Sequence, residues 1–254
     1  MCRTLTTSIK IFSSLIFFAC LVTTGKAGLL DKISVDAATD VVKATTITDA
    51  DLQASTRQMM VQMDAKNHVA PAGNKYAQRL VGLTKGMTNE DGLKLNFKVY
   101  LVRDINAFAT PDGSVRVFAG LMDKMTDDEL RFVMGHEIGH VKLGHSLKAT
   151  RTAYMASAAA KTASANSRLS TQQLSELGEK LLNAQFSQSQ ESDADAYGVG
   201  LMKRHKFNLA AAESSMRKLA ELDGTAAGGS SSMFSSHPGS KKRADKIHEM
   251  IAGK

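Results

Sequence analysis

The segment from Thr126 to His145 constrains the fold more than any other, because its residues must form a helix with one buried side. Thr126 followed by Glu129 is the pattern of a capping box, and the acidic residues between them favour the positive end of a helix dipole. Apolar residues then recur at helical spacing, which predicts a buried stripe of Leu130, Val133, Met134, Ile138 and Val141. The sequence His-Glu-Ile-Gly-His, residues 136–140, lies on this helix.

The spacing of His136 and His140 suits a shared metal ion. Residues four apart on a helix are separated by about one turn of ~5.4 Å, so both imidazoles can approach the same ion. Glu137 would lie beside that ion, where it can accept a proton from a water molecule whose pKa zinc lowers to about 7. A chance cluster on a solvated helix face is the alternative, but the neighbouring residues are apolar, and Gly135 and Gly139 leave room for a ligand. We therefore predict a zinc site with Glu137 as the general base.

A third protein ligand has to come from another part of the chain. His145 follows His140 by five residues, about 140° further round a continuing helix. We therefore expect His145 to point away from the metal and to meet exposed carbonyl groups at the helix end. The metzincin spacing is excluded, because Leu143 and Ser146 stand where that pattern requires Gly and His.

Glu191 and Asp195 are the best candidates further along the chain, since residues four apart share one face of a helix. In this interpretation, Glu191 is the third ligand. Asp195 accepts the second N–H of a ligand histidine and so fixes the tautomer of that histidine. An acidic surface turn is the alternative, but the preceding His-Glu-x-x-His motif favours the ligand interpretation.

Four ordered motifs together resemble metallopeptidase family forty-eight, the gluzincin family of the CAAX prenyl protease and the HtpX membrane protease. The resemblance extends over residues 50–251 and is closest to the small secreted bacterial branch, of the LoiP and YcaL kind. Integral-membrane members carry transmembrane helices around the catalytic core, whereas no such span is predicted here. The four motifs are Asn-Ala-Phe-Ala at 106–109, the helix motif at 136–140, Glu191 with Asp195, and Ser236-His237-Pro238 followed by Arg243.

The resemblance implies an α+β fold, a mostly helical zincin-like metalloprotease domain with one small β-sheet over the catalytic helix. The sequence patterns predict strands at residues 94–103, 107–110 and 114–119. An ordinary hairpin without a ligand is the alternative interpretation of the last two strands. By resemblance, substrate binds main chain to main chain on an edge strand made of Asn106, Ala107, Phe108 and Ala109.

His237 follows a Gly- and Ser-rich connector at residues 224–232, which suggests that a loop delivers this histidine to the cleft. As a hypothesis, His237 stabilises the oxyanion of the tetrahedral intermediate, and Arg243 orients His237 or adds positive charge. The alternatives are a helix-start residue beside Pro238 for His237 and a solvated helix charge for Arg243.

Cap signals predict further helices. A helix begins near Thr48 or Asp49 and runs to about Asn67, and Asn74 begins a second one. Ser170, together with Gln173, begins a third helix. A fourth helix begins at Asn208. The third helix is expected to face the core with Leu174, Leu177, Leu181, Leu182 and Phe186.

Residues 149–170, between the two metal motifs, are rich in Ala, Ser and Thr. This composition favours a helix but provides few large apolar groups for packing. We expect a weakly packed helical excursion near the cleft. As a hypothesis, it acts as a lid that gates substrate entry.

The N-terminus has the pattern of a targeting segment. Basic residues precede an apolar run of twelve residues, Ile11–Val22, and small residues lead to a cleavage site at Ala27. Twelve residues are short for a membrane span, which needs about 20. A lipoprotein anchored through Cys20 is the alternative processing route. We therefore predict a signal peptide at 1–27, a loosely ordered arm at 28–46 and a zinc metallopeptidase domain at 47–254.

Charge and cysteine content narrow the class of protein. Without the predicted signal peptide the chain has 29 basic and 25 acidic residues, so the net charge falls from +7 to +4. This modest excess is spread along the sequence and argues against nucleic acid as a partner. Both cysteines, Cys2 and Cys20, lie in the predicted signal peptide. The mature chain is therefore expected to bury one core, as a single domain, without a disulfide.

We predict a zinc-dependent endopeptidase, with one Zn²⁺ per chain, in the periplasm of a Gram-negative bacterium and soluble after cleavage near Ala27. By resemblance, its substrates are unfolded or misassembled envelope proteins, and association with the outer membrane is a further expectation. The alternative is a periplasmic chaperone or outer-membrane assembly factor that binds unfolded segments and uses zinc structurally. Glu137 favours the enzyme, because a structural site has no use for a carboxylate beside an open coordination position.

Overall fold

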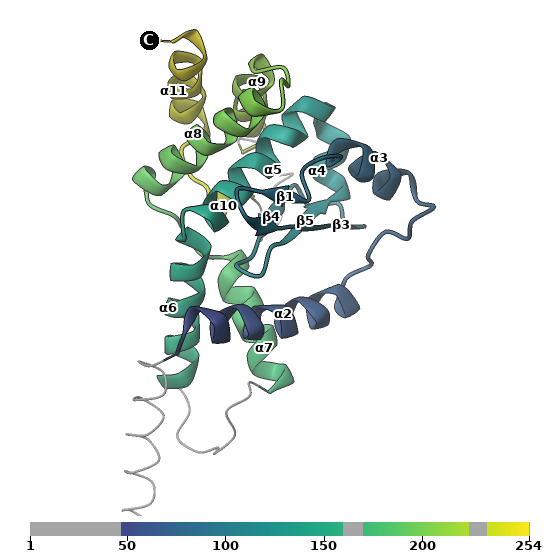
Figure 1. Cartoon of the computed structure of the whole chain (residues 1–254), viewed down its shortest axis with the longest axis vertical. Coiled ribbons are helices and arrows are strands. Elements are labelled where there is room, and N and C mark those ends of the chain that lie inside the picture. The colour runs from purple at the N-terminus through teal and green to yellow at the C-terminus, as the bar shows by residue number, and fades with distance from the viewer. Residues whose placement is uncertain (1–46, 160–169, 224–232, 254) are drawn as a thin grey trace, which may run out of the picture.

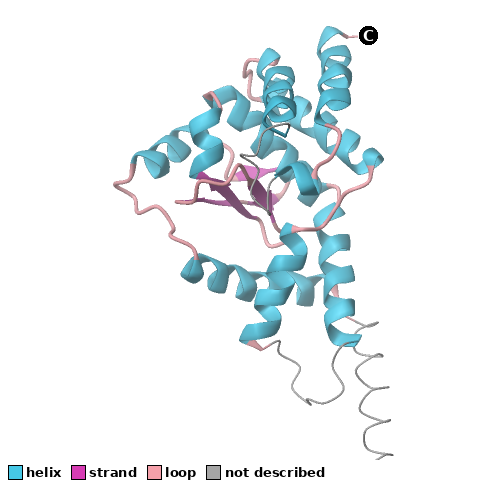
Figure 2. Cartoon of the chain, turned by 180° about the vertical axis from the view of Figure 1, so that it is seen from behind, coloured by secondary structure: helices cyan, strands magenta, loops and turns pink. Residues whose placement is uncertain are grey.

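The computed structural model describes residues 47–159, 170–223 and 233–253. The predicted signal peptide, the predicted N-terminal arm, the Gly- and Ser-rich connector and residues 160–169 of the predicted lid lie outside these ranges. Helices dominate the described part and surround a small sheet, as Figures 1 and 2 show from opposite sides. The predicted fold class, α+β and mostly helical, is confirmed.

Three strands form the central sheet, in the order β3 (Asn96–Tyr100), β5 (Ser114–Phe118) and β4 (Ala107–Ala109). β3 runs parallel to β5, while β4 runs antiparallel to it, with Phe108 opposite Arg116. All three strands fall within the predicted segments. β4 lies at the edge of the sheet, as predicted for the substrate-binding strand.

Different helices cover the two faces of this sheet, because side chains alternate between the faces along each strand. Figure 1 shows the sheet between α5 (Asp127–Lys142) and α2 (Asp49–Lys66). The face toward α5 is apolar and packs Ala109 and Val115 with Ile138 of the helix. The opposite face contacts Asp64 of α2 through Lys98, Tyr100 and Arg116.

Local cap signals located these four helices to within two residues of their starts. At each of the four, the side chain of the capping residue accepts a hydrogen bond from the main chain of the first turn. The fourth helix begins two residues later than predicted. The four are α2 after Thr48, α3 (Lys75–Leu83) after Asn74, α7 (Thr171–Leu182) after Ser170, and α9 (Ala210–Asp223) after Asn208.

The boundary between α7 and the next helix corrects one prediction. α7 ends at Leu182, so Phe186 does not face the core from that helix. A separate helix, α8 (Gln188–Arg204), begins with its own capping box at Ser187 and carries Glu191. Phe186 therefore lies in the short connection between the two helices.

The remaining elements are β1 (Asn89–Glu90), β2 (Leu93–Lys94), α4 (Ala119–Lys124), α6 (His145–Ala159), α10 (Met233–Ser236) and α11 (Ser240–Ala252). α9 packs against α11 and α5, and α11 also contacts α8, on the side of α5 away from the sheet. A two-residue pairing of β1 with β2 forms a second, unpredicted sheet. No helix in the described ranges combines the length and apolar character that a membrane span requires.

Candidate active site

Helix α5 places three polar side chains in the protein interior. The helix begins with the predicted capping box between Thr126 and Glu129. His136, Glu137 and His140 are each at most 3% exposed. The Nε2 atoms of the two histidines lie 3.0 Å apart, so both rings point toward one position.

α8 brings two carboxylates to these histidines. Glu191 lies 3.4 Å from Nε2 of His140 and 3.6 Å from Nε2 of His136. Oδ1 of Asp195 lies 2.9 Å from the other nitrogen of His136, Nδ1. The structure therefore brings the three predicted ligands together and places Asp195 against the second nitrogen of a ligand histidine.

His237 and Arg243 reach the same cluster from the C-terminal part of the chain. Nδ1 of His237 lies 2.9 Å from Glu191, and its Nε2 lies 3.5 Å from Glu137. The Arg243 guanidinium donates to both oxygens of Asp195 and pairs with Glu191 at 2.5 Å. Both side chains are buried, so the alternative of a solvated helix charge is wrong for Arg243.

The donor atoms suit a divalent metal. One nitrogen or oxygen from each of His136, His140, Glu191 and His237 lies within 4.8 Å of the others. Imidazole and carboxylate groups are the usual ligands of zinc, and a catalytic site leaves one position open beside its protein ligands. Oε1 of Glu137 is buried and has no hydrogen-bond partner among the described residues, as expected for an acceptor that awaits a water molecule.

The two buried glutamates, Glu137 and Glu191, have pKa values shifted in opposite directions, which suits them to different roles. Burial raises the pKa of Glu137 to about 7, so its carboxyl group can gain or lose a proton near neutral pH. Burial also acts on Glu191, but hydrogen bonds with His140 and His237 outweigh it and hold the pKa of Glu191 well below its ordinary value. Burial lowers the pKa of His136, which keeps this ring neutral, as a metal ligand must be.

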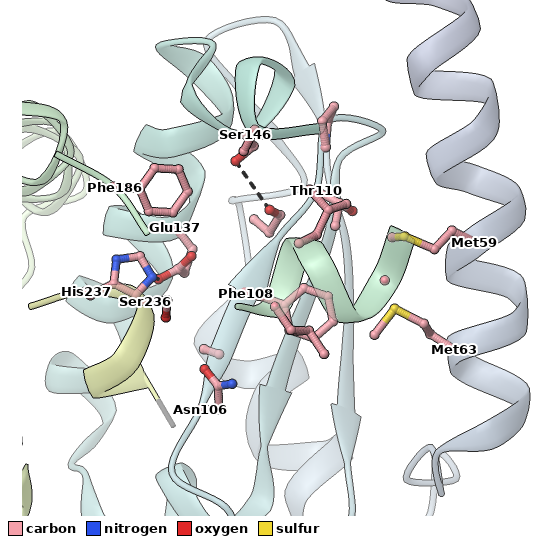
Figure 3. Close-up of a pocket in the computed structure, with 17 residues that line it drawn as sticks. Met59, Met63, Asn106, Phe108, Thr110, Glu137, Ser146, Phe186, Ser236 and His237 are labelled. Atoms are coloured by element: carbon pink, nitrogen blue, oxygen red, sulfur yellow. Dashed lines mark hydrogen bonds and ion pairs between the residues drawn. The ribbon is translucent and has the colours of Figure 1, made fainter. Parts of the chain in front are cut away.

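A narrow cleft runs along β4 beside these groups. Its walls include the predicted edge-strand residues 106–109, and Glu137 and His237 lie at one end (Figure 3). Leu181 of α7 and Met63 of α2 line the cleft on the other side. The free volume is about 40 Å³, which is room for water but not for a peptide. Helices α2 and α7 therefore close over the edge strand in this structure.

Phe186 covers the histidines, a position that the sequence did not predict. Its ring stacks on His140 with centroids 3.9 Å apart and the planes at 27°, and it also stacks on His237 at 5.4 Å. Figure 3 shows the Phe186 ring beside His237 and Glu137. An aromatic residue shortly before Glu191 was the only available signal; it lies in the five-residue connection 183–187 between α7 and α8.

His145 also lies elsewhere than predicted. α5 ends at Lys142, and Gly144 adopts a positive φ of 76°, so the chain turns before His145 opens α6. The assumption of a continuing helix was therefore wrong. The turn brings Nδ1 of His145 to 3.1 Å from Nδ1 of His140.

A buried His-Glu-x-x-His helix, a glutamate from a later helix and an edge strand beside the general-base position together define a metallopeptidase domain. The chain belongs to Peptidase family M48, whose family model matches residues 74–251. This result confirms the family resemblance. The protein is accordingly a metalloendopeptidase that acts on proteins, and the family implies a divalent metal, typically zinc.

Curated relatives support the same assignment. Metalloprotease YcaL of Escherichia coli strain K12 is 40% identical over 230 residues, which cover 89% of each chain. Metalloprotease LoiP of the same strain is 41% identical over 216 residues, covering 83% of this chain and 84% of LoiP. The putative beta-barrel assembly-enhancing protease of Vibrio cholerae is 29% identical over 164 residues, covering 59% of this chain and 34% of that protein.

Close packing of α5 on α8 sets the position of Glu191 and Asp195. A Cβ atom built on Gly198 would lie 3.2 Å from the main-chain nitrogen of His136 and 3.1 Å from the ring of Phe132. Both distances are shorter than an ordinary van der Waals contact. The absence of a side chain at Gly198 therefore lets α8 approach the catalytic helix.

Gly198→Val is expected to destabilise the protein by about 2 kcal/mol and to weaken zinc binding, because the added side chain pushes α8 away from α5. Urea unfolding and a zinc titration measure the two effects. Gly200→Val is the matched control, since a Cβ there would meet only the Arg204 side chain, at 3.6 Å. Equal stability and zinc affinity in the two variants would contradict the role of Gly198.

Proposed function

We propose that this protein is a zinc-dependent endopeptidase of the periplasm that cleaves unfolded or misassembled envelope proteins. The observation that carries the proposal is the position of Glu137. Its unbonded oxygen lies at the end of a cleft walled by an edge strand, next to the cluster of metal-ligand side chains. In this proposal His136, His140 and Glu191 hold one Zn²⁺, and Asp195 orients His136.

When bound, a zinc ion supplies a Lewis acid that polarises the scissile carbonyl and acidifies water. Glu137 accepts the proton of the attacking water and passes it to the leaving amine, for which a pKa of about 7 suits both transfers. His237 donates a hydrogen bond to the oxyanion. Arg243 holds Asp195 and Glu191 in place, and its Nη1 lies 3.5 Å from the carbonyl oxygen of His237.

The edge strand favours unfolded segments as substrates. The bonds from Phe118 N–H to Asn106 and from Thr110 N–H to Ser114 join β4 to β5. The main-chain groups of Ala107 and Ala109 therefore face away from β5. In this structure those of Ala109 contact Glu137 and the Ser146 hydroxyl, so a substrate that pairs with Ala109 would displace these contacts. A substrate that pairs there must be extended, and few of its side chains would be recognised. Unfolded proteins offer long stretches of extended chain with unpaired main-chain groups, whereas a folded domain pairs most of these groups within its own structure.

Substrate entry requires the cover over β4 to open. The cleft is too small for a peptide, and Phe186 stands over the histidines. We propose that residues 149–159 of α6, which belong to the predicted lid, move together with α7, with which α6 packs. The same opening would move Phe186 off the metal centre, since this residue directly follows α7.

The proposed location rests on the N-terminal pattern at residues 1–27 and on the relatives. One relative is named as a putative beta-barrel assembly-enhancing protease. The alternative of a lipoprotein anchored through Cys20 would place the same domain at the outer membrane. The rival function, a chaperone or assembly factor without proteolysis, gives no role to the buried, unbonded oxygen of Glu137.

The test uses the chain from Gly28 with one substrate protein in two forms, natively folded and kept unfolded by reduction and alkylation of its disulfides. We expect cleavage of the unfolded form only. Treatment with a chelator should stop cleavage, and stoichiometric Zn²⁺ should restore it. Cleavage that persists after complete metal removal would refute the proposal. Binding of the unfolded form without cleavage would support the chaperone instead.

A further inference from the structure

We infer that His145 is a positioning residue for the metal site: its Nδ1 accepts a hydrogen bond from Nδ1 of His140 and so fixes the tautomer and ring plane of that ligand. The two nitrogens lie 3.1 Å apart, and the ring planes meet at 63°. The inference rests on the proposed metal site, because it concerns how one of its ligands is held.

The direction of this hydrogen bond follows from the metal-facing nitrogen. Nε2 of His140 points at the cluster, 3.0 Å from His136 and 3.4 Å from Glu191. A neutral imidazole that offers the Nε2 lone pair to a metal carries its hydrogen on Nδ1. His140 is therefore the donor, and His145 must present a lone pair at Nδ1 and carry its own hydrogen on Nε2. The His145 ring is partly exposed, so water can accept that hydrogen.

The two histidines of the metal motif are supported differently. Nδ1 of His136 meets the carboxylate of Asp195, which Arg243 holds with two hydrogen bonds. Among the described residues, the hydrogen-bond contact of Nδ1 of His140 is His145. Partners of this kind orient ligand rings in metal sites, and their removal typically costs about 10–100-fold in metal affinity.

A neutral acceptor also suits the charge of the site. Glu137, Glu191 and Asp195, when ionised, carry three negative charges against the single positive charge of Arg243. An imidazole at position 145 orients His140 without adding a further negative charge, as a carboxylate would.

Phe186 and the start of α6 hold the pair together. The Phe186 ring stacks on His140 at 3.9 Å and lies 6.4 Å from the His145 ring, so it covers one side of both. Gly144, with its φ of 76°, provides the turn that aims His145 back at α5. The contact is thus built by the chain reversal between α5 and α6.

The experiment measures zinc affinity in the chain from Gly28 by competition with a chromophoric chelator. His145→Ala and His145→Leu are expected to weaken zinc binding about 10–100-fold. His145→Asn should recover most of the affinity, because its Oδ1 can accept near the position of Nδ1. The visible spectrum of the Co²⁺ form should change in His145→Ala and return toward wild type in His145→Asn. His68→Ala, at an exposed histidine, is the matched control.

Metal-free forms of all variants should melt at the wild-type temperature, which separates ring positioning from a general loss of structure. Wild-type zinc affinity and an unchanged Co²⁺ spectrum in His145→Ala would overturn the inference and leave the metal site intact. His136→Ala distinguishes that result from failure of the proposed function. If wild type and His136→Ala bound zinc equally, the metal site itself would be wrong, and the inference would fall with it.

Discussion

Glu137→Gln is expected to reduce peptide-bond cleavage by about 10²–10⁴-fold or more while zinc content stays at the wild-type level. The amide cannot accept the proton of the attacking water, whereas the proposed ligands His136, His140 and Glu191 are unchanged. Cleavage of an unfolded protein and metal analysis of the same samples measure the two quantities.

The structure explains why this substitution isolates the chemistry. Glutamine has nearly the size of glutamate, and its carbonyl oxygen can still accept the hydrogen bond that the main chain of Ala109 donates to Glu137. The change also removes a buried carboxylate, whose charged form is disfavoured there. The metal-free variant is therefore expected to melt no lower than wild type.

Glu221→Gln, at an exposed glutamate of α9, is the control and should cleave at the wild-type rate. Undiminished cleavage by Glu137→Gln at full zinc content would show that another group activates the water. If neither wild type nor Glu137→Gln cleaved any substrate although both held zinc, the chaperone would become the better account.

Asp64→Ala is expected to destabilise the protein by about 3 kcal/mol, because it leaves the Arg116 guanidinium buried without its carboxylate. Arg116 is 2% exposed and donates to Asp64 through Nε and Nη2, at 2.8 and 3.0 Å. Lys98 and Tyr100 donate to the same carboxylate from β3. This expected destabilisation lies at the low end of the range for broken buried ion pairs, because the Asp64 side chain is 16% exposed.

The effect of Asp64→Ala should depend on pH. Partial burial raises the pKa of Asp64, but hydrogen bonds from Arg116, Lys98 and Tyr100 outweigh this and hold the pKa below its ordinary value. The folded-state pKa thus lies below that of the unfolded chain, about 3.9. The carboxylate therefore stabilises the fold fully above that pH, and its contribution is lost as the pH falls through the folded-state pKa.

Urea unfolding at several pH values measures both the destabilisation caused by Asp64→Ala and its dependence on pH. The difference in unfolding free energy between wild type and Asp64→Ala should be largest near neutral pH and shrink below about pH 4. Arg217→Ala provides a control, since it removes an exposed ion pair with Glu213 and should change stability little. A pH-independent difference would mean that lost packing, and not the ion pair, causes the destabilisation.

Loss of the Asp64 contact would also affect the wall of the cleft along β4. Asp64 joins α2 to the face of the sheet opposite the catalytic helix, and α2 contributes Met59 and Met63 to the wall of the cleft. The pair between Asp64 and Arg116 therefore fixes one side of the cover over β4. Sequence alone gave no sign of this pair, because the partners are 52 residues apart.

The sequence by itself determined the features that depend on near neighbours along the chain. The capping box at Thr126 and the apolar spacing that follows it set where α5 starts and which side is buried. The same local rules placed His136 and His140 on one side of a helix and separated Glu191 from Asp195 by one turn. Such signals depend on residues only a few positions apart, so they can be recognised without knowledge of the fold.

Only the tertiary structure decided how these elements meet. The chain reverses at Gly144, and this reversal points His145 toward His140. Because α7 ends at Leu182, Phe186 lies outside that helix and covers the metal-ligand cluster. Arg243 became a buried partner of two carboxylates because α11 packs on α8. These contacts join residues from separate elements, and their energies come from burial and close approach, which no spacing along the sequence specifies.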